Sequence, residues 1–123
     1  MITFRRKNTE QDLMPKAIQH LEECGLPVNI IKASDADRVS KVNSKVRVIT
    51  SFRKNEAGCY EFTVKAKEFY RYMIKELGDI IGMRVTNTNQ SERTVTAETD
   101  HLGVILDVIE FFGIRYNLSL VSE

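Results

Sequence analysis

The chain has 123 residues and a mass of 14.1 kDa, which predicts a single domain over residues 1–123. Its 18 lysines and arginines nearly balance its 17 aspartates and glutamates, and the formal net charge of +1 excludes a strongly basic or acidic tail protein. Hydrophobic residues make up 42% of the sequence, a share that predicts a buried core and argues against intrinsic disorder.

The sequence indicates neither membrane insertion nor secretion. Its longest apolar stretch, residues 103–109, contains Asp107 and is far shorter than the roughly 20 residues that span a bilayer. Basic residues at positions 5–7 lead into polar residues, so we expect no signal peptide. We therefore expect a cytoplasmic protein with no membrane partner, in which Cys24 and Cys59 are reduced and buried.

The first predicted element is a helix that ends at Cys24. Its apolar residues recur at spacings of three and four, and the sequence at 9–12 matches a capping box. In a helix that started at this cap, Pro15 would clash with the carbonyl four residues earlier, so the regular helix is expected to begin at Met14 or Pro15. Gly25 is its expected stop.

Strands follow the first helix. Val28–Ala33 is predicted to be a strand, and residues 34–44, which are rich in turn formers, a polar connector. Segments 45–53 and 58–65 alternate apolar and polar residues around a turn sequence, which predicts a β-hairpin. In the first of these strands the alternation assigns Val46, Val48, Thr50 and Phe52 to an inner face and Lys45, Arg47, Ser51 and Arg53 to an outer face, with Ile49 as the exception on the outer face.

The second half of the chain adds two helices and three strands. The apolar stripe of residues 67–81 predicts a helix packed on a sheet. The remaining elements are a hairpin of strands Met83–Thr88 and Arg93–Thr99, a helix at His101–Phe112 and a last strand at Ile114–Val121.

These elements predict an α+β fold with a largely antiparallel sheet of about six strands and three helices packed on one side. Their order is α-β-β-β-α-β-β-α-β. A helix, a glycine and a strand follow one another three times, at Gly25, Gly82 and Gly113. Glycine adopts the left-handed conformation that turns a helix back onto a sheet, so this repeat indicates architecture and not function.

Charge is unevenly distributed along the chain. Residues 32–75 hold eleven basic and five acidic side chains, a net charge of +6, whereas residues 76–123 hold three and eight, a net charge of −5. A cationic sheet face of this kind is typical of phosphate-backbone binding, but a solvated face with no ligand has the same composition. Tyr60, Phe62 and Tyr116 fall on the apolar faces of their strands, so we expect them in the core and not on a base-stacking surface.

No catalytic or metal motif is evident. His20 and His101 are interpreted as having no histidine, cysteine or carboxylate at ligand spacing, so we expect no metal site and no cofactor. The carboxylate pairs at 22–23 and at 35 and 37 are interpreted as surface and turn residues, and the glycines are too scattered for a phosphate-binding loop. We therefore expect a protein that is not an enzyme and has no catalytic residues.

The order of elements over residues 13–112, with the strings Tyr60–Val64 and Ile81-Gly82-Met83, resembles the double-wing domain. That domain is the C-terminal DNA-binding domain of the middle-promoter transcription activators of T4-like bacteriophages, in which three helices are interspersed with a six-stranded sheet that binds DNA. The resemblance implies DNA, more than RNA, as the partner. It implies phosphate or groove contacts from Lys45, Arg47, Arg53, Lys54, Lys65, Arg84 and Arg93. The chain lacks the separate domain through which those activators contact RNA polymerase, so it would bind DNA without activating transcription.

Two functional hypotheses follow. The leading one is a small, non-enzymatic, phage-type regulatory protein that binds nucleic acid through the basic sheet face. The alternative is a protein–protein interaction module or an inhibitor of a host enzyme, including a homodimer formed through a sheet edge. The final strand and the acidic last third of the chain favour this alternative.

Overall fold

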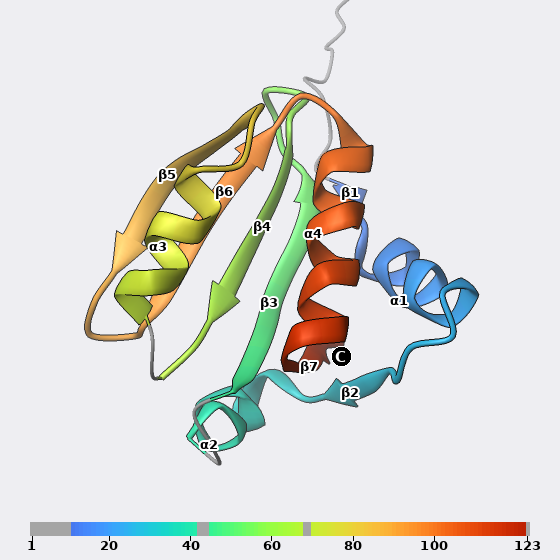
Figure 1. Ribbon diagram of the computed structural model, residues 1–123, viewed down its shortest axis with the longest axis vertical. Coiled ribbons are helices and arrows are strands. Elements are labelled where there is room, and N and C mark those ends of the chain that lie inside the picture. The colour runs from blue at the N-terminus through green and yellow to red at the C-terminus, as the bar shows by residue number, and fades with distance from the viewer. Residues whose placement is uncertain (1–10, 42–44, 68–69, 123) are drawn as a thin grey trace, which may run out of the picture.

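The computed structural model of the chain describes residues 11–41, 45–67 and 70–122. These residues form four α-helices and one open, mostly antiparallel sheet of seven strands (Figure 1), which confirms the predicted α+β class. The strands are β1 (Gln11–Asp12), β2 (Asn29–Ile31), β3 (Val46–Lys54), β4 (Tyr60–Lys65), β5 (Met83–Asn89), β6 (Thr94–Thr99) and β7 (Asn117–Val121). The helices are α1 (Met14–Glu23), α2 (Ala36–Ser40), α3 (Tyr70–Gly78) and α4 (Leu102–Arg115), with a 3₁₀ helix at Ala33–Asp35.

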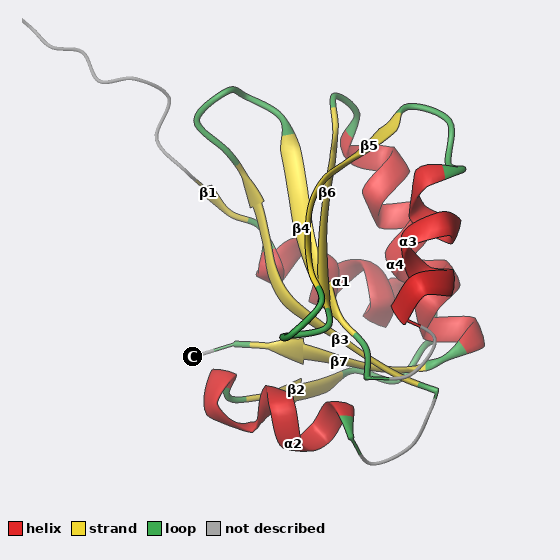
Figure 2. Ribbon diagram, turned by 90° about the vertical axis from the view of Figure 1, so that its left-hand side faces the viewer, coloured by secondary structure: helices red, strands yellow, loops and turns green. Residues whose placement is uncertain are grey.

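The sheet has the strand order β2-β7-β3-β4-β6-β5, and β1 pairs with β3 outside this path. The predicted hairpins β3–β4 and β5–β6 are both present and antiparallel. The last strand, β7, is parallel to both of its neighbours, β2 and β3. Figure 2 shows that the sheet is strongly twisted, so that β2 and β7 run across the direction of β4 and β6.

Three helices cover one face of the sheet. Side chains of α1, α3 and α4 form the main core with it, as expected of the three predicted helices. Phe62 is fully buried in this core, and Tyr60 and Tyr116 pack against it, which confirms their predicted place. The fourth helix, α2, lies on the opposite face (Figure 2).

Helix α2 falls where the sequence predicted a polar connector. Its residues Ala36 and Val39 pack on Val46 and Val48 of β3 and form a second, smaller apolar cluster. A helix of five residues is shorter than two turns, so it leaves no periodic pattern in the sequence. Packing against the sheet, and not an amphipathic sequence pattern, therefore stabilises this helix.

A β-bulge reverses the facing of side chains along β3. The register between β3 and β4 shifts at Thr50, which is the extra residue. Before the bulge Val46 and Val48 face α2, whereas after it Phe52 faces the main core. The predicted single inner face is therefore wrong, because it assumed unbroken alternation. Arg47, which alternates with the two valines, lies on the helix-covered face and is 1% exposed.

Gly25, just after α1, has the left-handed backbone expected of a helix stop, with φ of +73°. Gly82 is also left-handed, at +86°, but it lies in the turn before β5 and does not end α3, so the prediction that it stops this helix is wrong. Helix α1 begins at Met14, as expected, and the backbone N–H of that residue donates to Asp12 Oδ1 at 3.0 Å. The threonine of the predicted capping box lies outside the described residues. Helix α3 ends at Gly78, short of the predicted range, so Ile81 belongs to a turn and is 94% exposed.

Gly113 does not end a helix, contrary to the prediction. Helix α4 continues through it to Arg115. A Cβ at position 113 would lie 3.1 Å from Leu21 Cδ2 and 3.2 Å from Leu26 Cδ1. The glycine is thus needed for the close approach of α1 to α4 and not for a turn.

Candidate functional site

The predicted basic sheet face is not a single surface. Arg47 is the clearest correction, because the bulge in β3 places it under the helices and not on the outer face. Its Nη1 donates to Glu76 Oε1 at 3.2 Å, and its guanidinium carbon lies 3.9 Å from the centre of the Tyr116 ring and 5.0 Å from that of Phe112. Tyr116 also donates its hydroxyl to Glu76. Among the described residues, Arg47 Nη2 has no hydrogen-bond partner.

Two other predicted cations, Arg53 and Arg84, lie on the sheet beside carboxylates. Arg53 Nη2 is 3.0 Å from Glu61 Oε2, and Arg84 pairs with Glu98 at 3.1 Å. Hydrogen bonds to Glu98 and then to Asp100 raise the pKa of Arg84. This part of the sheet face therefore carries balanced charge and not a cationic surface.

Lys65 is covered on the same face, with a side chain only 7% exposed. Its Nζ donates to the backbone carbonyl of Glu92 at 2.6 Å and lies 3.5 Å from Asp37 Oδ1 on α2. The α2 helix and the β5–β6 turn thus enclose it. A helix that the sequence did not predict therefore removes Lys65 from the proposed binding surface.

The last three predicted cations lie near the ends of strands. The ammonium of Lys54 is 5.6 Å from the centre of the Tyr60 ring. Arg93 has a left-handed backbone in the β5–β6 turn and lies 5.7 Å from the Tyr70 ring. Lys45 is exposed just before β3. These cations do not share one face with Arg53 and Arg84.

One pocket does combine predicted cations with aromatic rings. We call it the basic pocket; it has a volume of about 280 Å³ and is lined by Lys45, Arg47, Tyr72, Arg115 and Tyr116. Tyr72 is 55% exposed. The pocket lies where β3 begins and α4 ends, so chain segments far apart in sequence build it. The sequence interpretation missed Tyr72 and Arg115, because it assigned them to a core helix and to a strand.

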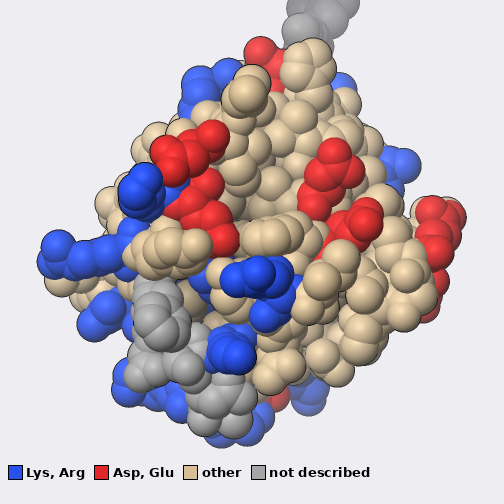
Figure 3. Space-filling model, viewed as in Figure 1, with Lys and Arg blue, Asp and Glu red and all other residues tan. Residues whose placement is uncertain are grey.

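A larger, apolar groove lies between the C-terminal part of α3 and the outer side of α4. This α3–α4 groove has a volume of about 620 Å³. Its walls include the apolar side chains of Ile80, Ile81, Val104 and Phe111 and the carboxylates of Glu76, Asp79 and Asp107. Ile81 is 94% exposed and Phe111 is 40% exposed, and Ile114 at 64% continues the apolar side of α4. In Figure 3 acidic side chains lie to the left and to the right in the upper half of this face, with residues that are neither acidic nor basic between them, whereas lysine and arginine side chains gather mainly on the lower part and at the left edge.

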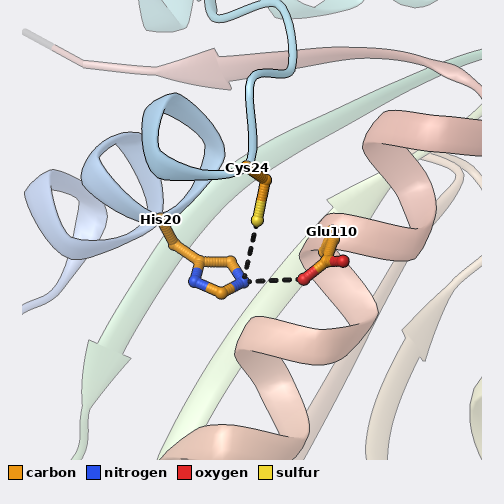
Figure 4. A group of neighbouring side chains, drawn as sticks. All are labelled: His20, Cys24 and Glu110. Carbon is orange, nitrogen blue, oxygen red and sulfur yellow. Dashed lines mark hydrogen bonds and ion pairs between the residues drawn. The ribbon is translucent and has the colours of Figure 1, made fainter.

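A third cluster joins α1 to α4 (Figure 4). His20 Nε2 lies 3.1 Å from Glu110 Oε1, and Cys24 Sγ lies 3.8 Å from the same nitrogen. Desolvation, followed by the carboxylates of Glu110 and Glu23, raises the pKa of the Cys24 thiol. The interpretation that His20 has no cysteine at ligand spacing is wrong, because a separation of four residues places both side chains on one side of a helix.

The aspartates at the start of α2 and the two cysteines are further residues that the sequence singled out. Asp37 and Asp35 pair with Lys41 and Arg38 along α2, at 2.8 and 3.3 Å. Both cysteines are free thiols, but Cys24 is exposed, so the prediction of a buried pair is wrong. The hydrogen bond of Cys59 Sγ to Asp100 is the largest contribution that raises the pKa of this thiol.

A scan against protein-family models and searches of the curated proteins and of the solved structures found no match to this chain. The resemblance to the double-wing domain therefore stays a prediction. None of the described helices is long and apolar enough to cross a membrane.

Proposed function

We propose that this protein is a non-enzymatic interaction module that docks a partner protein in the α3–α4 groove. The observation that carries the proposal is the exposed apolar lining of the groove, in which Ile81 is 94% exposed beside Phe111 and Val104. Soluble proteins rarely leave contiguous apolar surface uncovered unless it binds something. A partly exposed aromatic ring in a hollow is also the kind of residue around which interfaces form.

The rim of the groove indicates the chemistry of the partner. Glu76, Asp79 and Asp107 line a hollow whose interior is apolar. Glu76 is already paired with the buried Arg47, whereas Asp79 pairs at 3.0 Å with Lys75, whose side chain is exposed. A segment with two or three large apolar side chains flanked by lysine or arginine complements such a surface, and opposite charges speed association at low salt.

Selection from a peptide-display library tests this proposal, with the full chain as bait. We expect the selected peptides to have apolar residues flanked by basic ones. Their affinity should fall about 30-fold or more in Phe111→Asp and in Ile81→Asp, because a hot-spot residue contributes about 2 kcal/mol or more. Ile81 is almost fully exposed, so its substitution tests binding without disturbing the core.

The matched control is Ile30→Asp, since Ile30 is 53% exposed on β2 and does not line the groove. This variant should bind the selected peptides as the unchanged chain does. Light scattering over a range of protein concentrations shows whether the partner is a second copy of the chain. In that case Ile81→Asp should abolish the self-association. Equal binding by the groove variants and the control, with no self-association, would overturn the proposal.

A second candidate function is binding of single-stranded nucleic acid at the basic pocket. The specific observation in its favour is the exposed ring of Tyr72 in a pocket that Lys45 and Arg115 also line. Single-strand binding proteins stack bases on exposed rings and hold the phosphates with nearby cations. This proposal keeps nucleic acid as the partner but moves the contact from the sheet face to the pocket.

Fluorescence anisotropy of labelled DNA and RNA oligonucleotides against salt concentration tests the second candidate. Affinity should fall with added salt, and it should fall about tenfold in Tyr72→Ala because stacking contributes about 1–3 kcal/mol per base. Arg115→Glu should weaken binding, whereas the matched charge reversal Arg84→Glu, on the sheet face, should not. Salt-independent affinity, or equal losses in the two arginine variants, would exclude the basic pocket as the site.

A further inference from the structure

The cluster formed by His20, Cys24 and Glu110 contains three different metal-ligating atoms from two helices. Their ligating nitrogen, sulfur and oxygen atoms all lie within 4.8 Å of one another. His20 and Cys24 are four residues apart at the C-terminal end of α1, and Glu110 projects from α4 toward them (Figure 4). The cluster lies apart from both the α3–α4 groove and the basic pocket, whose linings do not include these residues.

The two distances from His20 Nε2 are close to those between the ligands of a tetrahedral zinc ion. With Zn–N, Zn–O and Zn–S bonds of about 2.0, 2.0 and 2.3 Å, a tetrahedral angle separates nitrogen from oxygen by about 3.3 Å and nitrogen from sulfur by about 3.5 Å. Here the corresponding separations are 3.1 Å from His20 to Glu110 and 3.8 Å from His20 to Cys24. The two separations that involve His20 therefore differ from the tetrahedral values by only a few tenths of an ångström. The third, between Cys24 Sγ and the Glu110 carboxylate, is within 4.8 Å, against about 3.5 Å for sulfur and oxygen on one zinc ion.

Close packing of α1 on α4 beside the cluster fixes the separation of the two helices that carry His20, Cys24 and Glu110. Gly113, three residues after Glu110 on α4, packs so closely against α1 that a Cβ at this position would lie 3.1 Å from Leu21 Cδ2. Leu21 follows His20 directly and is fully buried. The side chains of His20 and Glu110 are partly covered, at 24% and 38% exposure, so a bound ion would remain in contact with solvent.

We propose that His20, Cys24 and Glu110 bind a divalent cation of the zinc class. One sulfur, one imidazole nitrogen and one carboxylate oxygen suit Zn²⁺ or Co²⁺, whereas Ca²⁺ and Mg²⁺ need sets of oxygen ligands. Three protein ligands leave a fourth position for water, an arrangement also seen in zinc sites that bind small molecules. The ion would replace the contact between His20 and Glu110 and would join α1 to α4.

Titration of the full chain with Co²⁺, followed by absorption spectroscopy, tests the site. We expect saturable binding of one ion per chain, a sulfur-to-cobalt charge-transfer band and visible bands of tetrahedral intensity, all removed by added Zn²⁺. Cys24→Ser should abolish the charge-transfer band, and His20→Gln should weaken Co²⁺ binding at least tenfold. Glu110→Gln should keep the charge-transfer band, but a higher Co²⁺ concentration should be needed to saturate it.

The matched control is Cys59→Ser. Cys59 is also a free thiol beside a carboxylate, Asp100, but it lies outside the cluster, so its loss should leave the spectrum unchanged. Zinc should also raise the unfolding temperature of the unchanged chain and not that of Cys24→Ser. The proposal would be overturned by a charge-transfer band that survives in Cys24→Ser, or by the absence of saturable Co²⁺ binding.

Discussion

At the scale of single residues, Arg47 departs most from what a basic side chain on a strand usually does. Its guanidinium packs against the rings of both Phe112 and Tyr116 and is paired with Glu76, whose side chain is 15% exposed. Removal of one partner from a buried ion pair leaves the other charge without compensation, whereas removal of both is often nearly neutral. The charge of Arg47 is therefore already compensated inside the protein, by Glu76 and the two aromatic rings, and is not offered to a ligand on the surface.

Glu76→Gln should lower the free energy of unfolding by about 3 kcal/mol, because it leaves the buried guanidinium without a counter-charge. The double variant Arg47→Met, Glu76→Gln should recover most of this loss. Urea unfolding measures both, with Lys75→Gln as the control, since the Lys75–Asp79 pair on the same helix is exposed and should contribute little. If the Glu76→Gln and Lys75→Gln variants are equally stable, the Arg47–Glu76 pair contributes nothing to the stability of the fold.

At the scale of elements, the approach of α1 to α4 fixes the geometry of the His20, Cys24 and Glu110 cluster. Gly113 permits this approach, whereas Gly103, in the first turn of the same helix, has no atom within 4 Å of the place where a Cβ would stand. One glycine of this helix therefore has open space where a side chain would stand, whereas the other is closely packed. Substitution of each in turn separates the effect of helix propensity from the effect of packing.

Gly103→Ala should stabilise the protein by a few tenths of a kcal/mol up to about 1 kcal/mol, through helix propensity alone. Gly113→Val should instead destabilise it by about 1–3 kcal/mol, because the new side chain meets Leu21 and Leu26. Thermal unfolding of the two variants measures the contrast. A stabilising effect of Gly113→Val would show that the contact between α1 and α4 is not close-packed.

The elements that the sequence predicted correctly are those with a long periodic pattern. Helix α1, the two hairpins and the burial of Phe62 follow from apolar spacing and turn residues. The bulge at Thr50 carries no such pattern, because an extra residue is defined only by the partner strand. Ile49, the exception in the predicted alternation, was the one sign of it in the sequence.

The candidate sites were less predictable than the fold. The pair His20 and Cys24 can be recognised from a spacing of four residues, but Glu110 joins them only through packing 90 positions along the chain. Likewise, the exposure of Ile81 depends on α3 ending at Gly78, before the apolar stripe ends. Sites built from distant segments need the tertiary structure before they can be seen.

At the scale of the whole molecule, the near-neutral total charge conceals two separate surfaces. The cationic middle of the chain contributes Lys45 to the basic pocket, and the acidic last third contributes Asp79 and Asp107 to the α3–α4 groove. The two candidate functions therefore belong to two pockets that share no lining residue. Ile81→Asp should leave oligonucleotide binding unchanged, and Tyr72→Ala should leave peptide binding unchanged, because Ile81 does not line the basic pocket and Tyr72 does not line the groove. Failure of one proposal therefore does not carry over to the other.

The placement of α2 also has a consequence for the motions of the protein. This helix has five residues and rests on a small apolar cluster of its own, so we expect it to open at a low cost in free energy. Each opening uncovers Val46, Val48 and the ammonium of Lys65, which the closed helix shields. The sheet face is thus charge-balanced on average but becomes briefly more cationic and more apolar, at a frequency set by the stability of one short helix.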